Sequence, residues 1–354
     1  MTQAAAAPVA VVSDYLATEL GDPAWRDCEI TLIAGGRSNL TFLVTSAAGE
    51  VVLRRPPMSS VLPTAHDMAR EHTVISRLGE GRSPVPVPRT RLFCADESVL
   101  GAPFYVMDRV PGYVVTDTLP AGYAERPEER EAIGHAVIDV LADLHGVDPA
   151  AVGLGEYGRP DGYLERQLRR WTKQWAATRL PDDPAADDLD ALAHRLAETR
   201  PHGESGPIVH GDYRIGNMIL DPDRPGRVAA LLDWEMSTLG DPLADVGMLL
   251  IYWQESPTGD PWAATTRSAP SVTALDGFPG RRAIVQRYAE RTGRSLDHLD
   301  WYLGFASFKL AVVAAGVAAR GRAGAMIGDG FVEAAEMVGP LVAAGARVLR
   351  HGLD

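Results

Sequence analysis

"VHGDYRIGNMILD", residues 209–221, is the stretch of sequence that carries the strongest signal for a fold and a site. Within it, Asp212 and Asn217 stand five positions apart in a predicted loop. The stretch "LLDWE", residues 231–235, follows closely and contributes Asp233. Three side chains that carry oxygen atoms therefore fall within one short region of the chain.

Two short runs of β-forming residues follow the loop, and the second of them contains Asp233. They are "MILD", residues 218–221, and "VAALLDW", residues 228–234. The segment "PDRPGR" between them contains Pro and Gly, which favour a turn, so the pattern predicts a small hairpin. Asp233 is then expected at the end of the second hairpin strand.

A carboxylate, an amide and a second carboxylate around one hairpin fit the needs of phosphoryl transfer. In that reaction a carboxylate orients the attacking hydroxyl, while Asp and Asn oxygens hold Mg²⁺ against the triphosphate. Magnesium keeps waters and substrate oxygens in its shell, so two protein ligands suffice. Asp and Asn are also common in turns, where they bond the local backbone. Turn preference explains each residue alone but not all three together.

The paired motifs closely resemble those of the aminoglycoside phosphotransferase family, a branch of the protein-kinase-like fold, and the resemblance covers nearly the whole chain. His210 and Gly211 complete an HGD signature, and "LLDWE" stands where protein kinases carry DFG. The resemblance implies that Asp212 is the catalytic base or hydroxyl-orienting residue, with His210 in support. It also implies that Asn217 and Asp233 bind Mg²⁺ and that ATP or GTP is the phosphoryl donor.

The expected fold class is α+β, with two lobes of the protein-kinase-like kind. Residues 1–107 are expected to form a small antiparallel-sheet lobe that binds nucleotide, with three strands in 30–54 and a helix in 66–78. Residues 108–354 are expected to form a larger, mainly helical lobe. The change from strand-like to helix-like periodicity after the strand expected in 104–113 sets this boundary. Further helices are expected at 131–145, 163–175, 189–199 and 303–319.

The segment "GGRSN" resembles the phosphate-covering turn between the first two strands of that fold. It supplies Gly35, Gly36, Ser38 and Asn39. Glycine permits a close approach of the backbone to phosphate, and neighbouring amides and a hydroxyl can donate hydrogen bonds. A Gly-Gly pair is equally at home in an ordinary hairpin turn.

Other nucleotide-side residues follow from the same resemblance. Arg54 stands where most relatives have a strand lysine, and Glu71 matches its helical partner; a surface ion pair is the alternative. Arginine cannot simply replace a lysine point charge, so this departure affects the expected nucleotide geometry. The backbone of Asp108 and Val110 is expected to border the base. Asp245 is expected to brace the catalytic loop, or else to serve only as a helix-start residue.

The acceptor is expected to be a small molecule with a hydroxyl group. The segments "GAPFYVMDRVPG" and "STLGDPLADVG" are similar in sequence to the phosphotransferase domains attached to acyl-CoA dehydrogenases. A hydroxy acid or a hydroxyacyl thioester is therefore predicted, and an aminoglycoside is the alternative. A basic face on the helix expected at 163–175 fits an anionic acceptor, although such a face is also typical of solvated helices. Its members are Arg166, Arg169, Arg170 and Lys173, with Trp171 and Trp175 nearby in sequence.

Composition limits the other classes of function. The chain has 354 residues, of which 46% are apolar, and a formal net charge of −13. Such an acidic balance argues against a broad surface for nucleic acid or anionic membrane. Cys28 and Cys94 lack the spacing of a disulfide framework or a zinc site and are expected to be reduced and buried. Residues 1–10 lack the basic start of a secretory signal, so a cytoplasmic protein that retains a disordered start is expected.

Two other classes remain open. A nucleotide-binding regulatory module without catalysis is suggested by Arg54 in place of lysine. A magnesium-dependent hydrolase would explain the carboxylates but would leave the Gly-rich turn, Arg54 and Glu71 without a shared role. A Walker-type ATPase is poorly supported, because the chain has no GxxxxGK[ST] pattern. The apolar run at 303–319 is interrupted by Lys309 and is expected to form a core helix rather than a membrane span.

Overall fold

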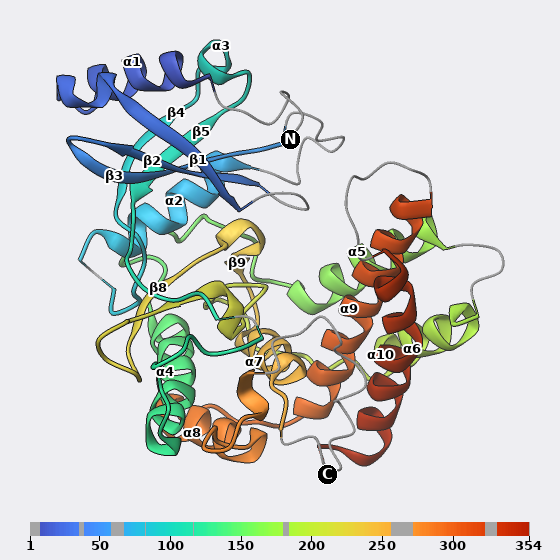
Figure 1. Ribbon diagram of the computed structural model, residues 1–354. Coiled ribbons are helices and arrows are strands. Elements are labelled where there is room, and N and C mark those ends of the chain that lie inside the picture. The colour runs from blue at the N-terminus through green and yellow to red at the C-terminus, as the bar shows by residue number, and fades with distance from the viewer. Residues whose placement is uncertain are drawn as a thin grey trace. The chain divides into compact units, whose positions relative to one another are not determined.

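The chain folds into two compact units in the computed structural model (Figure 1). The first comprises Met1–Pro111 and Ala230–Glu235, and the second comprises Gly112–Ala229 and Met236–Asp354. The first unit therefore extends past residue 107 and takes in the "LLDWE" motif; the nucleotide and acceptor roles of the two parts stay predictions. The described residues are 8–34, 39–57, 67–81, 83–115, 117–179, 184–255, 272–322 and 331–353.

The first unit is built on a five-stranded antiparallel sheet with the order β1-β2-β3-β5-β4. The three strands predicted within residues 30–54 are present, and Gly49, at φ 124°, closes the tight turn between the second and third of them. The strands are β1 (Cys28–Ala34), β2 (Leu40–Ser46), β3 (Gly49–Arg55), β4 (Thr90–Cys94) and β5 (Phe104–Asp108). Gly35, Gly36 and Ser38 of the predicted phosphate-covering turn lie outside the described residues.

Alternation along the strands sorts the side chains between the two faces of this sheet. Leu53 and Val106 are cross-strand partners and join the core cluster that also contains Leu16 of helix α1 (Val9–Glu19). The next pair, Arg54 and Tyr105, must face the opposite way. That face receives helix α2 (Met68–Gly79), and short α3 (Glu97–Leu100) leads into β5.

The second unit is mainly helical, with two short two-stranded sheets that frame the "HGD" loop. β6 (Ile208–Val209) pairs with β9 (Thr238–Leu239), and β7 (Met218–Leu220) pairs with β8 (Val228–Leu231), which confirms the predicted hairpin. β8 ends at Leu231, so Asp233 follows the strand rather than ending it. The helices are α4 (Pro127–Gly146), α5 (Tyr163–Thr178), α6 (Ala186–Glu198), α7 (Pro242–Tyr252), α8 (Arg281–Thr292), α9 (Leu299–Arg322) and α10 (Phe331–His351).

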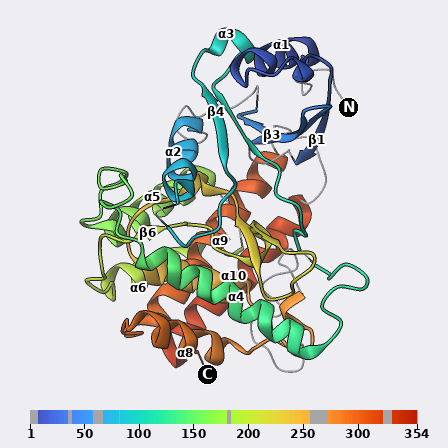
Figure 2. The ribbon, with the colours of Figure 1, turned by 90° about the vertical axis from the view of Figure 1, so that its left-hand side faces the viewer.

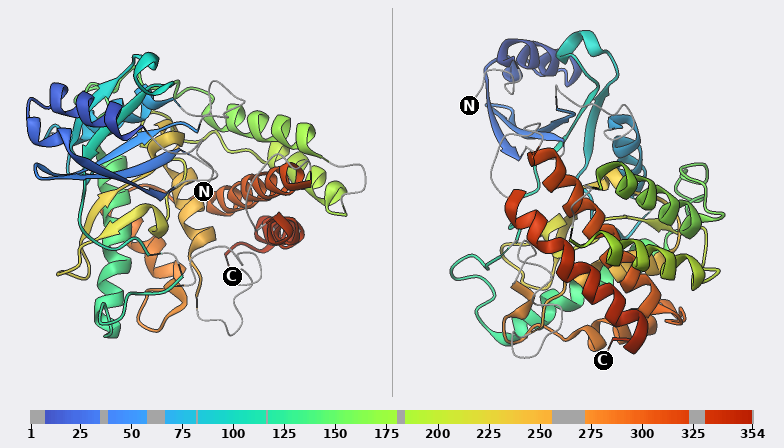
Figure 3. Two further views of the ribbon diagram at one scale, coloured as in Figure 1. Left: turned by 45° about the horizontal axis from the view of Figure 1, so that its top comes forward. Right: turned by 90° about the vertical axis from the view of Figure 1, so that its right-hand side faces the viewer.

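Helix α9 is the centre of this unit, as the apolar run at 303–319 predicted. It packs against α5, α6, α7 and α10, and Figure 3 shows α10 running beside it. It is the one helix among the described residues that is long and apolar enough to cross a membrane, and 83% of that apolar window is buried within the protein. Its burial by neighbouring helices accounts for its composition.

Helices α4 and α8 lie side by side at the edge of the same unit (Figure 2). The guanidinium of Arg287 on α8 forms a bidentate pair with the carboxylate of Asp139 on α4, at 2.8 and 2.7 Å. Such paired hydrogen bonds fix geometry as well as contributing energy. The pair therefore fixes the orientation of α4, whose last turn carries His145.

Replacing Gly247 by alanine is expected to destabilise the protein by about 1–3 kcal/mol, because the core at this point has no space for an added methyl group. An added Cβ at Gly247 would lie 2.7 Å from the backbone oxygen of Tyr302, where α7 packs on α9. Urea unfolding measures the change in free energy.

Gly146→Ala at the exposed end of α4 is the matched control, because this glycine has no left-handed φ and an added Cβ there meets no described atom within 4 Å. It is expected to stabilise by about 0.5–1 kcal/mol through helix propensity. Equal stability of the Gly247 variant and the unmodified protein would contradict the close approach of α7 to α9.

Candidate functional site

The loop after β6 is held by one buried carboxylate. The backbone N–H of His210 donates to Oδ2 of Asp245 at 2.6 Å, and the N–H of Gly211 donates to Oδ1 at 2.7 Å. Asp245 lies in the first turn of α7 and is 1% exposed. The Asp245 side chain therefore fixes the two consecutive peptide groups that come immediately before Asp212.

Gly211 itself is required by the backbone. Its φ is +85°, and an added Cβ would lie 2.6 Å from the backbone oxygen of Met236. A side chain at this position would be strained by both conformation and contact. The carbonyl of Gly211 accepts a hydrogen bond from Nζ of Lys309 on α9 at 2.5 Å, so the residue is held through both its N–H and its C=O.

A buried series of hydrogen-bonded side chains, His145 and Tyr288, supports Asp245. Nε2 of His145 lies 3.3 Å from Oδ2 of Asp245, and Nδ1 lies 2.8 Å from the hydroxyl of Tyr288. Burial lowers the pKa of His145. Burial alone would raise the pKa of Asp245, but hydrogen bonds from His145 and from the His210 N–H hold it below its usual value. The carboxylate thus stays ionised and able to accept both backbone N–H groups.

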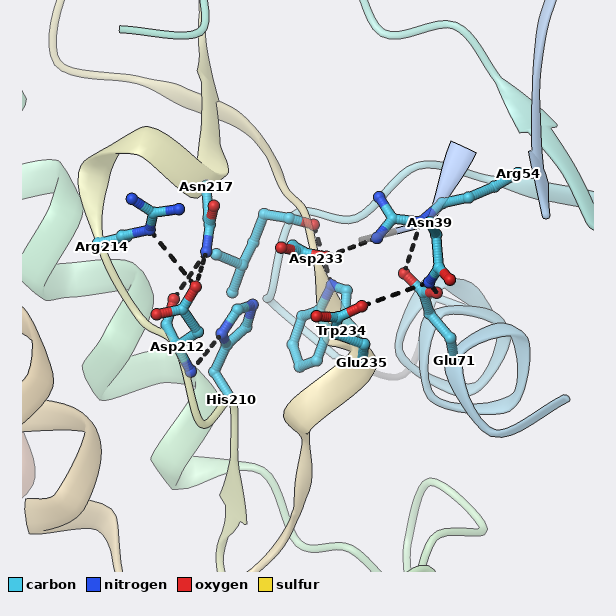
Figure 4. A network of polar contacts seen from close by, with 11 residues as sticks. Asn39, Arg54, Glu71, His210, Asp212, Arg214, Asn217, Asp233, Trp234 and Glu235 are labelled. Atoms are coloured by element: carbon cyan, nitrogen blue, oxygen red, sulfur yellow. Dashed lines mark hydrogen bonds and ion pairs between the residues drawn. The ribbon is translucent and has the colours of Figure 1, made fainter. Parts of the chain in front are cut away.

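Asp212 and Asn217 lie together in this loop, as Figure 4 shows. The side-chain amide of Asn217 donates to the backbone oxygen of Asp212 at 2.8 Å and to its Oδ2 at 3.0 Å. The carbonyl oxygen of the Asn217 side chain is the remaining polar atom, and it is the atom type that Mg²⁺ prefers. Oδ1 of Asp212 has no hydrogen bond to any described residue, and the Asp212 side chain is 21% exposed.

Arg214 belongs to the same group, although the sequence analysis did not single it out. Its Nε lies 3.4 Å from Oδ2 of Asp212, and its guanidinium lies over the ring of Tyr252, 5.1 Å from the centroid. The available sequence signal was a cation two positions after a candidate catalytic carboxylate. A positive charge here attracts anions to the loop.

A second polar group lies in the first unit and contains Asp233 (Figure 4). Nη2 of Arg54 on β3 donates to Oδ1 of Asp233 at 2.5 Å. Its Nε lies 3.1 Å from Oε1 of Glu71 on α2, an ion pair that lacks hydrogen-bond geometry. The side chains of Arg54 and Glu71 are 11% and 1% exposed, so this is a buried pair rather than a surface one.

The charges in this group oppose the effects of burial. Burial would lower the pKa of Arg54, but Glu71 and Asp233 raise it well above its usual value. Burial raises the pKa of Glu71, and Arg54 counteracts part of that rise. The side chain of Asn39 donates to Glu71 at 3.2 Å and to Glu235 at 3.4 Å. Asn39 therefore anchors the start of β2 to this cluster.

Asp233 has an unusual backbone conformation. Its φ is +67°, in the left-handed region, where Asp is tolerated better than most residues. Held conformations of this kind cluster at functional sites. In this conformation, the Asp233 side chain, two residues after the end of β8, accepts its hydrogen bond from Arg54 on β3.

The remaining candidates occupy more ordinary positions. Asp108 ends β5, its N–H donates to the backbone oxygen of Arg89, and its carboxylate pairs with Arg91; Val110 follows in the connecting segment. On α5, Arg166 donates to two backbone oxygens of the preceding loop and Arg169 pairs with Glu165 at 2.9 Å. Arg170 is exposed and its guanidinium lies over the ring of Trp171, while Lys173 is exposed on the same helix.

No group of three or more His, Cys, Asp or Glu side chains able to hold a metal is found in the part of the chain that the structure describes. Magnesium does not require such a cage, because nucleotide oxygens and waters fill most of its shell. The side-chain oxygens of Asn217 and Asp233 are of the right chemical kind for it.

Residues 29–284 match the phosphotransferase enzyme family known as APH. The chain belongs to this family. A Ralstonia eutropha protein provisionally named an aminoglycoside phosphotransferase is 31% identical, with a TM-score of 0.78 over 95% of this APH chain and 96% of that one. An aminoglycoside phosphotransferase solved with GDP and kanamycin is 16% identical, with a TM-score of 0.63 over 93% and 97% of the two chains, and shows the shared fold.

A third similar protein is acyl-CoA dehydrogenase family member 10 of Mus musculus. It is 34% identical over 321 residues, which are 90% of this APH chain and 29% of the mouse protein. The APH chain thus spans less than a third of that relative's length. Together these findings confirm the predicted family and the α+β protein-kinase-like fold, and they support small-molecule phosphotransfer as the general class of activity.

Arg54→Met is expected to destabilise the protein by about 3–5 kcal/mol, because it leaves Glu71 buried and unpaired. The folded-state pKa of Glu71, already raised by burial, rises further without Arg54. A folded pKa above the unfolded one means that the loss is small below about pH 4.3 and grows as the pH rises through the folded value. Urea unfolding at pH 5 and pH 8 measures both effects.

The double variant Arg54→Met/Glu71→Met should recover most of the stability, because it buries no charge. Arg109→Met removes an exposed pair with Glu50 in the same unit and should cost less than about 1 kcal/mol. A double variant as unstable as the single one would show that the ion pair is not the cause.

Proposed function

We propose that this protein transfers the γ-phosphoryl group of ATP or GTP, with Mg²⁺, to the hydroxyl of a hydroxy acid or a hydroxyacyl thioester. The observation that carries the proposal is the fixed loop in which Asp212 has one carboxylate oxygen held and the other open. Oδ2 accepts from Asn217 and lies by Arg214, while Oδ1 has no described partner. An incoming hydroxyl can donate to that open oxygen.

Asp212 then acts as the residue that orients the acceptor hydroxyl and takes its proton. Because Asp245 fixes the two preceding peptide groups, the carboxylate does not have to be positioned anew for each reaction. Positioning of this kind is worth roughly 7–11 kcal/mol of barrier reduction, whereas a general base contributes about 10²–10⁴-fold in rate. Most of the proposed catalysis is therefore placement.

The side-chain oxygens of Asn217 and Asp233 are the proposed magnesium ligands. When bound, the metal neutralises charge on the phosphate oxygens and holds them in line with the acceptor. The Asn217 amide is oriented by its two bonds to Asp212, which leaves its oxygen for the metal. Arg54 is the proposed contact for the phosphates of the donor, since a guanidinium binds phosphate through paired N–H groups.

The acceptor is inferred from charge and from relatives. The mouse relative is named an acyl-CoA dehydrogenase family member, which suggests that this domain works on an acyl compound. Arg170 and Lys173 are exposed cations on α5 and suit an anionic acceptor. An aminoglycoside is polycationic and suits these cations less well, so we rank it as the second candidate. The case for an aminoglycoside rests on the name of the Ralstonia eutropha relative.

Asp233→Asn is expected to lower magnesium-supported turnover more than Asp212→Asn does, because misplacing the metal and phosphates removes the larger share of the barrier reduction. Asp212→Asn should lower kcat by about 10²–10⁴-fold and retain nucleotide binding, measured by calorimetry. Asp223→Asn, an exposed position in the β7–β8 turn, is the matched control and should turn over normally. Normal turnover by either folded site variant would contradict the assignments.

A screen with labelled ATP or GTP and Mg²⁺ tests the reaction class and the acceptor together. The panel contains 3-hydroxybutyrate, its coenzyme A thioester and kanamycin, and mass spectrometry identifies the product. Transfer to the hydroxyacyl compounds and not to kanamycin is expected. The reverse pattern would replace the acceptor assignment. Nucleotide binding without transfer would favour a regulatory module, and acceptor-independent phosphate release would favour a hydrolase.

A further inference from the structure

Lys309 is a cation placed inside the apolar core helix α9. It is 8% exposed, and the residues around it on the helix are buried. Its position is costly, because a buried ammonium loses hydration that only acceptors or anions can replace. Burial lowers the pKa of Lys309, and the nearby carboxylates of Asp212 and Asp245 oppose that shift. The group is therefore close to the candidate catalytic residue.

The ammonium of Lys309 is incompletely satisfied by the protein. It has three N–H donors, and the structure shows one acceptor for it among the described residues, the carbonyl of Gly211 at 2.5 Å. It also lies over the ring of Trp171, 5.4 Å from the centroid. An aromatic face attracts the charge but does not take a hydrogen bond in the way that an oxygen does.

The indole N–H of Trp171 is a second donor that lacks a hydrogen-bond acceptor among the described residues. Its indole Nε1 is buried and finds no hydrogen-bond partner within the described ranges, although the residue is only 4% exposed. Other buried indole N–H groups do find acceptors: that of Trp175 donates to the carboxylate of Asp190, and those of Trp234, Trp253 and Trp301 donate to backbone oxygens. A buried donor without a partner costs about 1–3 kcal/mol, so a ligand oxygen that accepts from Trp171 would be stabilised there.

The kind of ligand that would satisfy this place is set by its chemistry. Lys309 and Trp171 offer only donors, and Arg170 lies over the same indole ring at 5.4 Å and adds a second positive charge. A carboxylate or an acyl carbonyl oxygen can accept from both donors. A cationic group would be repelled by Lys309 and Arg170.

The location links this ligand to the reaction. Lys309 is bonded to the residue immediately before Asp212, and consecutive Cα atoms are about 3.8 Å apart. A molecule with an oxygen at Lys309 can therefore bring a hydroxyl to Asp212 with a chain of only a few carbons between them. A hydroxyacyl compound has both groups at that separation.

The geometry points to Lys309 and Trp171 as the residues that bind the acyl oxygen of the acceptor, whether carboxylate or thioester carbonyl, while its hydroxyl faces Asp212. The inference rests on the proposed function and names the acceptor subsite within it. It makes Lys309 a specificity-determining residue, since the same buried charge that attracts an acyl oxygen excludes a polycationic amino sugar.

A purely positioning role for Lys309 makes a different prediction. If Lys309 only fixes the Gly211 carbonyl, its removal slows the transfer to every acceptor by a similar factor. If it binds the acyl oxygen, its removal acts mainly on acceptors that possess that oxygen. A pair of acceptors that differ in this group separates the two roles.

The experiment compares 3-hydroxybutyrate with 4-methyl-2-pentanol, which keeps the secondary hydroxyl and has an isopropyl group of similar shape in place of the carboxylate. The unmodified protein should prefer the acid in kcat/KM. Lys309→Met should reduce that preference by about 10–100-fold, the range expected for losing a hydrogen bond to a charged group, mainly through KM. Trp171→Phe, which keeps an aromatic ring while it removes the indole N–H together with part of the bicyclic ring, should reduce it by about 3–10-fold.

Arg322→Met is the matched control, because it removes a positive charge from an exposed position on the same helix. It should leave the preference unchanged. Calorimetry with 3-hydroxybutyrate gives a readout independent of turnover, and Lys309→Met should weaken the measured affinity.

An equal loss of activity on the acid and the alcohol in the Lys309 variant, with unchanged affinity for the acid, would overturn the inference and leave the proposed function standing. Should Lys309→Met fail to fold, an unchanged preference in Trp171→Phe overturns it. Transfer by the unmodified protein to kanamycin alone, or to no acceptor, would instead show that the proposed function is wrong.

Discussion

The carboxylate of Asp245 is the constraint on which the rest of the site depends. It accepts hydrogen bonds from two consecutive peptide groups, those of His210 and Gly211, and it does so from the buried first turn of α7. A loop held in this way cannot rotate without leaving a buried charge unsatisfied, which is far more costly than losing an exposed hydrogen bond. The position of Asp212 is thereby fixed by the packing of α7 on α9, although Asp212 itself remains partly exposed.

In the first unit, one cation balances the charges of two carboxylates. Arg54 lies between Glu71, which is almost completely buried, and Asp233, which is partly exposed. A lysine ammonium is a compact charge, whereas a guanidinium has separate N–H groups that reach two carboxylates at once. Arginine in place of the expected lysine therefore fits the two carboxylates of this chain. The departure alone does not argue for loss of activity.

Much of the fold was predictable from local patterns, and the two failures have different causes. Strands within residues 30–54 and the β7–β8 hairpin were marked by Gly and Pro at their turns, and the α9 core helix by its apolar length. Helix α1 was missed because an Ala- and Val-rich start gives little periodic signal. Lys309 and Trp171 were not recognised as neighbours of the loop because Lys309 meets Gly211 across 98 positions of sequence. Contacts set by helix packing leave no trace in local spacing.

The same reasoning explains why the sequence predicts the phosphotransferase family more firmly than it predicts the acceptor. In the proposed reaction, one loop and one hairpin hold the donor and the transferred group, and their residues lie within one short stretch of sequence. The acceptor must be recognised by side chains from helices that are distant in sequence, and these can change while the loop stays the same. In this chain those helices place Lys309 and the Trp171 indole N–H, two donors without enough acceptors, next to the loop. The acyl oxygen of the proposed acceptor would satisfy both donors and offset the cost of burying them.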